Sequence, residues 1–411
     1  MSAALRVLYC TDTYEPQVNG VSVVTALSAH GLRSRGWECA VVAPRYPKAR
    51  TRVDVAAVPS DPLVTRTSVA SAPLPFYPEV RLAAPSFLAV RRAVRDFRPD
   101  LVHCQTEFVI GRMGQIAAQH AGIPLVSSYH TDFAKYTKAY GAGFLRRGVS
   151  AYLGRFHRRS RRVYTPSAPA RADLMRSGLD NVEVWGRGVE TDTFHPSRRS
   201  RVARAARGFG GAFGFLYVGR LAAEKGVDVI LDAYRLATRL VPSGAIKLVI
   251  AGAGPSEEAL RRSAPADVAF LGYLDRQTAL PQLFASADAF VFASLTETLG
   301  LVVLEAMASG LPVIATPAGG VADHLRDGVN GLAYPARNAE ALAHAMVALA
   351  LDRGRAAALG AAARQTAELL DWEREIDRLD VSYREVCAQL SPCVHGEKIA
   401  PDAPPLHAAI G

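Results

Sequence analysis

Cysteines and long apolar runs are both scarce in this chain of 411 residues. The five cysteines form an odd number and contain no C-x-x-C pair. This argues against a disulfide framework or a cysteine-built metal site and indicates a reducing cytosol. No run of 18 apolar residues exists, so we expect no membrane-spanning helix. The first residues show neither a basic stretch nor a cleavage site, and we expect no signal peptide.

The glycine fingerprint of dinucleotide-binding proteins is also missing. The loop after the first expected strand reads TDTYEPQVNGVSVV, which is not G-x-G-x-x-G, so we expect no dinucleotide there. It does place Asn19 and Gly20 directly before a helical pattern, where free amides can face an anion. A turn glycine with an N-capping asparagine is the alternative, and this stretch alone favours it.

Positive charge is unevenly distributed along the chain. Residues 1–190 hold 26 Lys and Arg against 14 Asp and Glu, a net charge of +12, whereas the remainder has a net charge of −2. A basic half next to a nearly neutral one implies an anionic partner for the basic half. Nucleic acid, anionic lipid and phosphorylated metabolites all satisfy this condition.

Short apolar runs alternate with helical patterns through most of the sequence. This alternation predicts parallel sheets covered on both faces, with about five strands in each half, as two Rossmann-like sheets. Ligands of such sheets bind beyond the carboxyl ends of the strands, so a cleft between the halves is the expected site. The expected strands are residues 5–10, 38–44, 101–105, 124–130 and 162–167, then 214–220, 246–252, 268–273, 289–294 and 312–316.

Two Rossmann-like domains and a tail follow from this pattern. We expect a first domain over residues 1–190, with a linker in GRGVETDTFHPSRRS, and a second domain over residues 197–370. A further helical pattern covers residues 371–390. Residues 391–411 are rich in Pro, Ala and Gly without a period, and we expect them to be disordered.

Two cations follow the first strand of the second half. In YVGRLAAEKG, Arg220 and Lys225 form an R-x4-K pair at a strand–loop–helix junction. Two cations placed there could neutralise a diphosphate without a metal, because Arg supplies a bidentate fork and Lys a compact charge. The alternative is a solvated pair in which Glu224 screens Lys225.

Two carboxylates bracket an apolar helical stretch further on. In SLTETLGLVVLEAMASG, Glu297 precedes the expected helix and Glu305 lies two turns inside it. Amides at the helix start stabilise a carboxylate or receive a ligand oxygen. A buried carboxylate needs partners, and the vicinal hydroxyls of a ribose are suitable ones. A structural ion pair is the alternative. In the first half, His130 ends a strand and so faces the same cleft, although a lone histidine there is more often structural.

These stretches together resemble a known family. VGRLAAEKG, SLTETLGLVVLEAMASGLPVIAT and GGVADHLRDGVNG are similar to the nucleotide-sugar half of glycosyltransferase family four, whose E-x7-E and R-x4-K signatures match. The first-half stretches TDTYEPQVNGVSVV and SSYHTDFAKYTKAYG resemble bacterial GDP-mannose-dependent α-mannosyltransferases that act on lipid acceptors. The resemblance implies the GT-B fold, retention of configuration, and a helix in residues 371–390 that crosses back to the first domain.

The resemblance also implies roles for individual residues. Arg220 and Lys225 would hold the diphosphate, Glu305 the ribose, and His130 the transferred sugar. Glu297 would bind the sugar hydroxyls together with a run of backbone amides, and the base would lie beside a Gly-Tyr pair. The other implied contacts are Asn19 and Gly20 at the donor phosphate and sugar, the amides of Thr298, Leu299 and Gly300, and Gly272 and Tyr273 at the base. Leu299 replaces a Phe that many members have, which should affect packing only.

No cofactor and no metal are expected. The sequence has no Asp-x-Asp motif and no His/Cys cluster, and Arg220 with Lys225 can stabilise the leaving phosphate as a metal does elsewhere. The resemblance favours GDP-mannose as the sugar donor over a UDP-sugar, for example one that carries a glucosyl or sulfoquinovosyl group. A sugar-nucleotide epimerase or a phosphorylase on the same fold is a rival, and front-face attack is favoured over a covalent route.

One basic segment suggests a membrane surface. In FLRRGVSAYLGRFHRRSRR, an apolar face is surrounded by seven arginines, which is typical of a helix on anionic lipid. We therefore expect a cytoplasmic protein, peripheral on the inner face of the membrane. A helix with its apolar face on the core is equally compatible. A nucleic-acid-binding protein is the rival of another class, but no recognition motif supports it and we expect no nucleic-acid partner. The apolar residues are Phe144, Leu145, Val149, Tyr152, Leu153 and Phe156, and the arginines are Arg146, Arg147, Arg155, Arg158, Arg159, Arg161 and Arg162.

Overall fold

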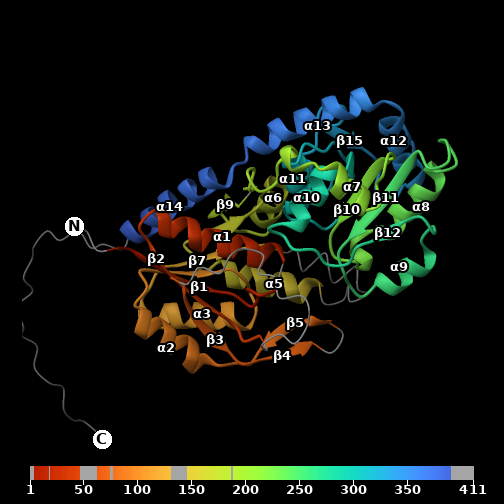
Figure 1. Ribbon diagram of the computed structural model, residues 1–411. Coiled ribbons are helices and arrows are strands. Elements are labelled where there is room, and N and C mark those ends of the chain that lie inside the picture. Colours follow the sequence, from red (N-terminus) through yellow and green to blue (C-terminus); the bar gives the residue numbers. More distant parts are fainter. Residues whose placement is uncertain are drawn as a thin grey trace, which may run out of the picture.

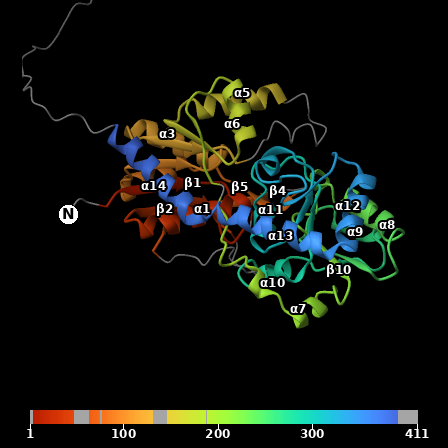
Figure 2. The same ribbon diagram turned by 90° about the horizontal axis from the view of Figure 1, so that it is seen from above.

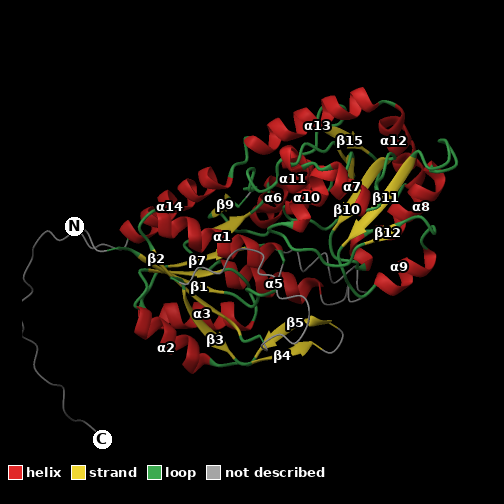
Figure 3. Ribbon diagram, viewed as in Figure 1, coloured by secondary structure: helices red, strands yellow, loops and turns green. Residues whose placement is uncertain are grey.

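The computed structural model contains two parallel sheets, each covered by helices on both faces (Figures 1 and 3). It describes residues 4–17, 19–46, 63–74, 77–130, 146–186 and 188–389. The first sheet has seven strands in the order β3-β2-β1-β6-β7-β8-β9, all parallel. They are β1 (Arg6–Cys10), β2 (Glu38–Pro44), β3 (Thr65–Val69), β6 (Leu101–Cys104), β7 (Leu125–Ser128), β8 (Arg162–Thr165) and β9 (Val182–Val184).

The helices of this half follow the strands, as a parallel sheet requires. Asn19 starts the first of them: its side-chain oxygen accepts a hydrogen bond from the Ser22 amide at 3.0 Å. A small antiparallel hairpin, β4 (Ser71–Leu74) and β5 (Tyr77–Ala83), lies outside the main sheet. The helices are α1 (Gly20–Ser34), α2 (Phe87–Phe97), α3 (Val109–Ala121), α5 (Arg146–His157) and α6 (Ala168–Arg176).

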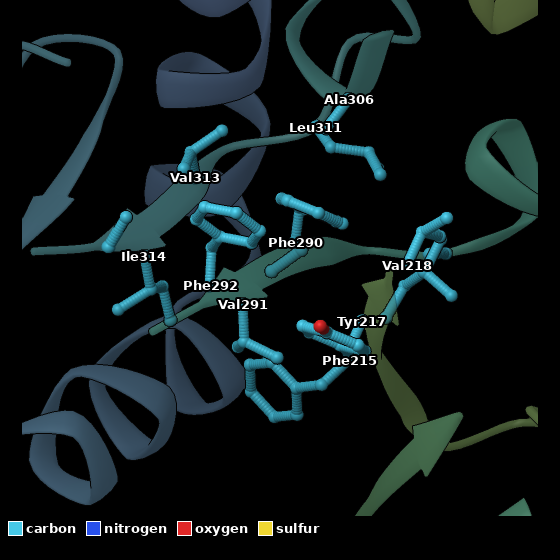
Figure 4. Packing of buried hydrophobic residues seen from close by; sticks show 14 of the residues in the cluster. Phe215, Tyr217, Val218, Phe290, Val291, Phe292, Ala306, Leu311, Val313 and Ile314 are labelled. Carbon is cyan, nitrogen blue, oxygen red and sulfur yellow. The ribbon is translucent and has the colours of Figure 1, made fainter. Parts of the chain in front are cut away.

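The second sheet has six parallel strands in the order β12-β11-β10-β13-β14-β15. All six residues of β10, FGFLYV, are buried, which explains its continuous apolar sequence. Aromatic side chains of adjacent strands pack on one face, with the Tyr217 and Phe292 rings 6.3 Å apart (Figure 4). The strands are β10 (Phe213–Val218), β11 (Ile246–Ala251), β12 (Ala269–Phe270), β13 (Ala289–Phe292), β14 (Val313–Ala315) and β15 (Gly331–Ala333).

Seven α-helices and three short 3-10 turns are described along the second half up to residue 368. The buried helix α11 carries the E-x7-E stretch, and α13 packs beside it. The α-helices are α7 (Arg201–Ala206), α8 (Val227–Ala237), α9 (Glu257–Ser263), α10 (Ala279–Ser286), α11 (Leu301–Ala308), α12 (Ala339–Leu351) and α13 (Arg353–Glu368); the 3-10 turns are η2 (Pro196–Arg198), η3 (Ala223–Lys225) and η4 (Gly319–Asp323).

The last described helix, α14 (Trp372–Ala388), returns to the first sheet. Figure 1 shows it in blue, running from α13 to a position over α1, and Figure 2 shows the same path from above. The Trp37 indole donates to Asp380 at 2.6 Å, and Arg35 pairs with Glu373 at 3.0 Å. Where the chain crosses between the halves, the Val189 amide donates to the Leu370 carbonyl at 3.0 Å. The expected crossing helix is therefore confirmed.

Both strand orders reverse at one point, which fixes where ligands can bind. In the first sheet β1 lies between β2 and β6, and in the second sheet β10 lies between β11 and β13. Loops that leave two such strands in opposite directions open a crevice at their carboxyl ends. Those loops contain residues 11–19 in the first half, and 219–225 with 293–300 in the second half.

The expected core strands are all present, but the strand count was wrong. The sequence predicted about five strands in each half, whereas the sheets have seven and six. The missed strands are edge or near-edge elements without an apolar run: TRTSV is mostly exposed, and two others have three residues each. The expected disordered tail, residues 391–411, lies outside the described residues.

Candidate active site

Lys225 and Glu297 meet at the switch point of the second sheet. Lys225 ends the turn after β10, and Glu297 lies in the loop between β13 and α11. The Lys225 ammonium donates to Glu297 Oε1, and the two side chains are 16% and 18% exposed. Burial alone raises the pKa of the Glu297 carboxyl, but the attraction of Lys225 outweighs it, so this pKa lies below its usual value. Glu297 is therefore a carboxylate at neutral pH, able to accept hydrogen bonds from hydroxyl groups.

Arg220 has its own acidic neighbour. Its guanidinium lies 3.4 Å from Glu224, whose side chain is only 1% exposed. The ion pairs at this loop are Arg220 with Glu224 and Lys225 with Glu297. The Arg220 side chain is still 37% exposed. Arg220 and Lys225 after β10 and Glu297 after β13 thus lie at the carboxyl edge of the second sheet, where Lys225 and Glu297 are in contact.

The loop before α11 lies on a pair of glycines. The Gly320 amide donates to the Glu297 carbonyl at 2.8 Å. A Cβ atom on Gly319 would lie 2.1 Å from that carbonyl oxygen, and one on Gly320 would lie 2.3 Å from the Thr298 carbonyl oxygen. Only glycine permits this approach of two backbones. The GG of GGVADH therefore supports the loop that carries Glu297, Thr298, Leu299 and Gly300 to the start of α11.

Glu305 is buried in an ion cluster that the sequence reading missed. Arg276 donates to Glu305 Oε1 through Nε at 3.1 Å and Nη2 at 2.7 Å, and it also bonds Glu190. Arg276 is 3% exposed and Glu305 is 4% exposed. Burial raises the pKa of Glu305 even though Arg276 opposes this. The ion-pair alternative is therefore realised at Glu305, while its contact with a ribose stays a prediction.

Gly272 and Tyr273 follow β12 at the same edge of the sheet. The Tyr273 hydroxyl is buried and has no hydrogen-bond partner in the part of the chain that the structure describes. Burial raises the pKa of this phenol to about 12, so it remains a hydrogen-bond donor. A buried hydroxyl without a partner is uncommon in folded proteins, and the contact of Tyr273 with a nucleotide base stays a prediction.

In the first half, His130 lies opposite these loops. Its Nε2 atom is 2.6 Å from Gln105 Oε1, and its backbone carbonyl accepts a hydrogen bond from the Thr298 hydroxyl. The second contact joins the two halves directly. Burial and, secondarily, the charge of His157 lower the pKa of His130 to about 4. The imidazole is therefore neutral at physiological pH.

Asn19 and Gly20 stand at the start of α1, on the carboxyl edge of the first sheet. Asn19 caps the helix, as its alternative reading predicted, and its amide nitrogen donates to the Thr13 hydroxyl at 2.6 Å. A Cβ atom on Gly20 would meet nothing within 4 Å. Packing therefore does not require glycine there, and the space in front of it is open.

A small pocket lies where the two halves face each other. It is lined by the start of α6 and by the Glu297 loop, and the Ala168 amide at the start of α6 donates to Asp323 of the second half at 2.8 Å. Residues of both halves thus line this pocket. The lining residues are Ser167, Pro169, Ala170, Asp173, Leu295, Thr296, Glu297, Thr298 and Gly319.

The described residues contain no group of three or more His, Cys, Asp or Glu side chains placed to hold a metal ion. They also contain no helix that is both long and apolar enough to cross a bilayer. Independence from metal remains a prediction.

Within the described residues the basic segment forms α5, which ends at His157 before the last arginines of the segment. Leu153 and Phe156 face the core, while Tyr152 is 42% exposed and donates to the Glu107 carbonyl. Phe144 and Leu145 lie outside the described residues. Arg162 does not belong to the surface cluster: it pairs with Glu183 at 3.0 Å and with Glu385 of α14 at 2.9 Å. The exposed arginines here are Arg147, Arg155, Arg158, Arg159 and Arg161.

Comparison with solved structures identifies the architecture. Sucrose-phosphate synthase from Thermosynechococcus elongatus aligns with a TM-score of 0.75 at 20% identity, over 94% of this chain and all of the other. Anabaena HepE in complex with UDP-glucose aligns with a TM-score of 0.73 at 21% identity, over 93% of this chain and all of the other. Both structures are similar to this chain in fold. The expected GT-B arrangement of two Rossmann-like sheets is confirmed.

Sequence comparison identifies the family. Residues 18–193 match the model described as Glycosyltransferase Family 4, and residues 212–352 match Glycosyl transferases group 1. A GDP-mannose-dependent alpha-mannosyltransferase of Mycobacterium tuberculosis is 34% identical, over 93% of this chain and 97% of that protein. Sulfoquinovosyl transferase SQD2 of Arabidopsis thaliana is 31% identical, over 74% of this chain and 60% of that protein. The chain therefore belongs to glycosyltransferase family 4 and is a glycosyltransferase.

Proposed function

We propose that the chain transfers a mannosyl residue from GDP-mannose to a hydroxyl group of a lipid-linked or glycolipid acceptor, with retention and without a metal. The observation that carries the proposal is the meeting of Arg220, Lys225 and Glu297 at the switch point of the second sheet, opposite His130. The name of the donor comes from three relatives of 30–34% identity that are called GDP-mannose-dependent alpha-mannosyltransferases. This chain covers 90–99% of their length.

The reaction breaks the bond between the anomeric carbon and the diphosphate oxygen, so negative charge grows on the leaving phosphate. Arg220 and Lys225 lie in the loop after β10 and would stabilise this charge, together with amides at the starts of α8 and α11. Lys225 is then shared between Glu297 and the phosphate. Glu297 would position the sugar by accepting hydrogen bonds from its hydroxyls.

We propose that the anomeric configuration is retained because the acceptor hydroxyl attacks from the front face. The leaving phosphate then accepts the proton of that hydroxyl. A covalent route needs a carboxylate that is free to attack the anomeric carbon. Glu297 is engaged by Lys225, and Glu305 is engaged by Arg276 inside a buried cluster. Each carboxylate is thus held in an ion pair, Glu297 with Lys225 and Glu305 with Arg276, and this favours the front-face route.

A UDP-sugar donor is the second candidate. Its support is the similarity to sulfoquinovosyl transferase SQD2, but that similarity extends over 74% of this chain, against 93% for the mannosyltransferase of M. tuberculosis. For this reason GDP-mannose is the stronger proposal.

The exposed arginines of α5 and of the residues directly after it support a peripheral position on the inner face of the cytoplasmic membrane. Five arginines of residues 147–161 face outward, while the apolar side of the helix is on the core. Charges at an anionic surface contribute about 1 kcal/mol each, so several together give reversible binding. A lipid acceptor would then meet the first half, and the nucleotide would bind the second half.

The donor is tested by thermal shift and turnover with GDP-mannose, GDP-glucose, UDP-glucose and UDP-sulfoquinovose. The expected result is stabilisation by GDP-mannose above the others, and release of GDP that depends on added glycolipid acceptor. The matched control is Glu258→Ala, a surface carboxylate of α9, which should behave as wild type. Stabilisation by a UDP-sugar alone would refute the GDP-mannose assignment, and nucleotide release without acceptor would favour an epimerase or a hydrolase. The anomeric configuration of the product, read by NMR, tests retention.

A further inference from the structure

A buried chain of hydrogen bonds leads from α14 to His130. The Tyr383 hydroxyl of α14 bonds His103 Nδ1, and His103 Nε2 lies 2.7 Å from the Ser128 hydroxyl. The Gln105 amide nitrogen lies 3.4 Å from His103 Nδ1, and its oxygen lies 2.6 Å from His130 Nε2. The side chains of His103, Gln105, Ser128 and Tyr383 are inaccessible to solvent. This chain, which we call the relay, connects the crossing helix with the candidate site.

Gln105 dictates which nitrogen of His130 carries the proton. An amide oxygen can only accept a hydrogen bond, so His130 Nε2 must be the donor in this contact. A neutral imidazole carries one proton, which leaves Nδ1 as an acceptor. The low pKa of His130 keeps the ring neutral at physiological pH. No residue among those described donates to Nδ1, and His130 is partly exposed.

We propose that Gln105 is a positioning residue, which holds His130 as the Nε2–H tautomer so that Nδ1 accepts a hydrogen bond from a hydroxyl of the transferred sugar. This rests on the proposed contact of His130 with that sugar. Because Nδ1 carries no proton and can only accept, the sugar hydroxyl must be the hydrogen-bond donor at this contact. The Thr298 hydroxyl on the His130 carbonyl fixes the same residue from the second half. His130 is thus held on its ring and on its backbone.

Two further histidines and one glutamate lie around His130 and can affect this tautomer. His103 lies behind Gln105, and His157 faces the ring from the end of α5. Glu107 lies 3.3 Å from His157 Nε2, so this carboxylate is directed at His157. Gln105 Oε1 is the only described hydrogen-bond partner of the His130 ring. A change at position 105 should therefore alter the proton positions of His130 directly.

Three variants test the proposal. Gln105→Met removes the acceptor at similar size, and Gln105→Glu replaces it with a carboxylate. Gln115→Met is the matched control, because Gln115 is equally buried in the same half and donates to the Phe156 carbonyl at 2.8 Å without touching His130. Nitrogen-15 NMR of labelled imidazoles, without substrate, reads the tautomer directly, and the His130→Asn spectrum assigns the signal.

Wild-type protein should show His130 neutral, with its proton on Nε2. Gln105→Met should give a mixture of tautomers and lower kcat by roughly 10- to 100-fold, as expected for loss of orientation, with a smaller change in KM. Gln115→Met should leave both unchanged apart from stability. In Gln105→Glu the new carboxylate raises the pKa of His130, so the ring gains a second proton and Nδ1 becomes a donor. Its activity should be lost at low pH and return as pH rises through that pKa.

The proposal is overturned if wild-type His130 carries its proton on Nδ1 or is an imidazolium at neutral pH. It is equally overturned if Gln105→Met keeps the pure Nε2–H tautomer, or if folded Gln105→Glu has the pH profile of wild type. The NMR measurement is made without a nucleotide sugar. A failure of the GDP-mannose assignment, which would appear in the donor panel, is therefore distinguishable from a failure of the role given to Gln105.

Discussion

Replacement of Arg276 by Met should cause a large loss of stability in the second half. Arg276 bonds two carboxylates, those of Glu190 and Glu305, and its guanidinium lies 5.0 Å from the centre of the Phe194 ring. The side chains of Arg276 and Glu305 are 4% and 6% exposed. The variant leaves both carboxylates in place without their cation. Removal of one partner from a buried ion pair costs about 3–5 kcal/mol.

The loss should depend on pH in a defined direction. Burial already raises the pKa of Glu305, and removal of Arg276 takes away the main opposing interaction. A carboxyl whose folded pKa is raised contributes stability below its unfolded pKa of about 4.3, and that stability disappears as pH rises through the folded value. The deficit of the variant should thus be largest at neutral pH and should shrink as the pH falls toward ~5.

Urea denaturation and calorimetry at several pH values measure this effect. With roughly 2–4 °C per kcal/mol for a folding unit of 150–250 residues, the melting temperature should fall by about 6–20 °C. Arg262→Met is the control: its pair with Glu258 is 71% and 85% exposed, and such pairs contribute about 0–1 kcal/mol. The double variant Arg276→Met/Glu305→Gln should recover part of the loss. A loss of less than about 1 kcal/mol, or one that does not depend on pH, would refute the reasoning.

Three further predictions concern activity and location. Lys225→Ala and Glu297→Ala should keep the fold and lower turnover by about 10²–10³-fold, because each removes a charged contact at the reacting bond; near-normal turnover by folded Lys225→Ala would contradict the phosphate role. Activity should survive EDTA, since two cations are available in place of a metal, and a strict requirement for added magnesium or manganese would contradict this. Binding to vesicles that contain phosphatidylglycerol should weaken as salt rises and should be lost when Arg155, Arg158, Arg159 and Arg161 are changed to Gln. Arg162 is kept in that variant because it pairs with Glu183 and Glu385, and equal binding by wild type and variant would exclude the lipid-facing role.

The core of the fold could be predicted because buried parallel strands carry continuous apolar runs. The strand at Glu38–Pro44 was predicted with its observed bounds, and the strand at Phe213–Val218 within two residues. The edge strands could not be predicted in the same way. β3 is paired on one side and mostly exposed, so its sequence TRTSV has no hydrophobic signal. Its place is determined by backbone pairing with β2, which depends on the fold around it.

The site could be predicted in part for a related reason. Sequence spacing relative to strand ends located Arg220, Lys225 and Glu297, because loops after parallel strands converge at one edge. It did not reveal which carboxylate pairs with which cation. Glu224 is the sequence neighbour of Lys225, yet Lys225 bonds Glu297, which is 72 residues away. Such pairing depends on side-chain directions that follow only from the assembled sheet.

Arg276 and Gln105 illustrate the limit more sharply, since neither belongs to a recognisable motif. Each is buried and polar, and each acts through a second residue: Arg276 holds Glu305, and Gln105 holds His130. A buried polar group must have a partner, so the position of one such group constrains the next. Glu305 and His130 are therefore each attached to a buried polar residue that their own motif does not reveal.

The pairing of charges bears on how this site would bind a donor. Arg220 and Lys225 are balanced by Glu224 and Glu297, so the four side chains carry no net charge. Unpaired cations in partly buried positions would be costly before a substrate arrives. Under the proposed roles, a diphosphate would bring negative charge to a site whose cations already have partners, and it would compete with Glu297 for Lys225. The sugar hydroxyls can compensate by donating to the Glu297 carboxylate as Lys225 turns to the phosphate. Under the proposed roles, the intact donor should therefore bind more tightly than the bare nucleotide, because only the donor would supply both the anion for Lys225 and the hydroxyls for Glu297.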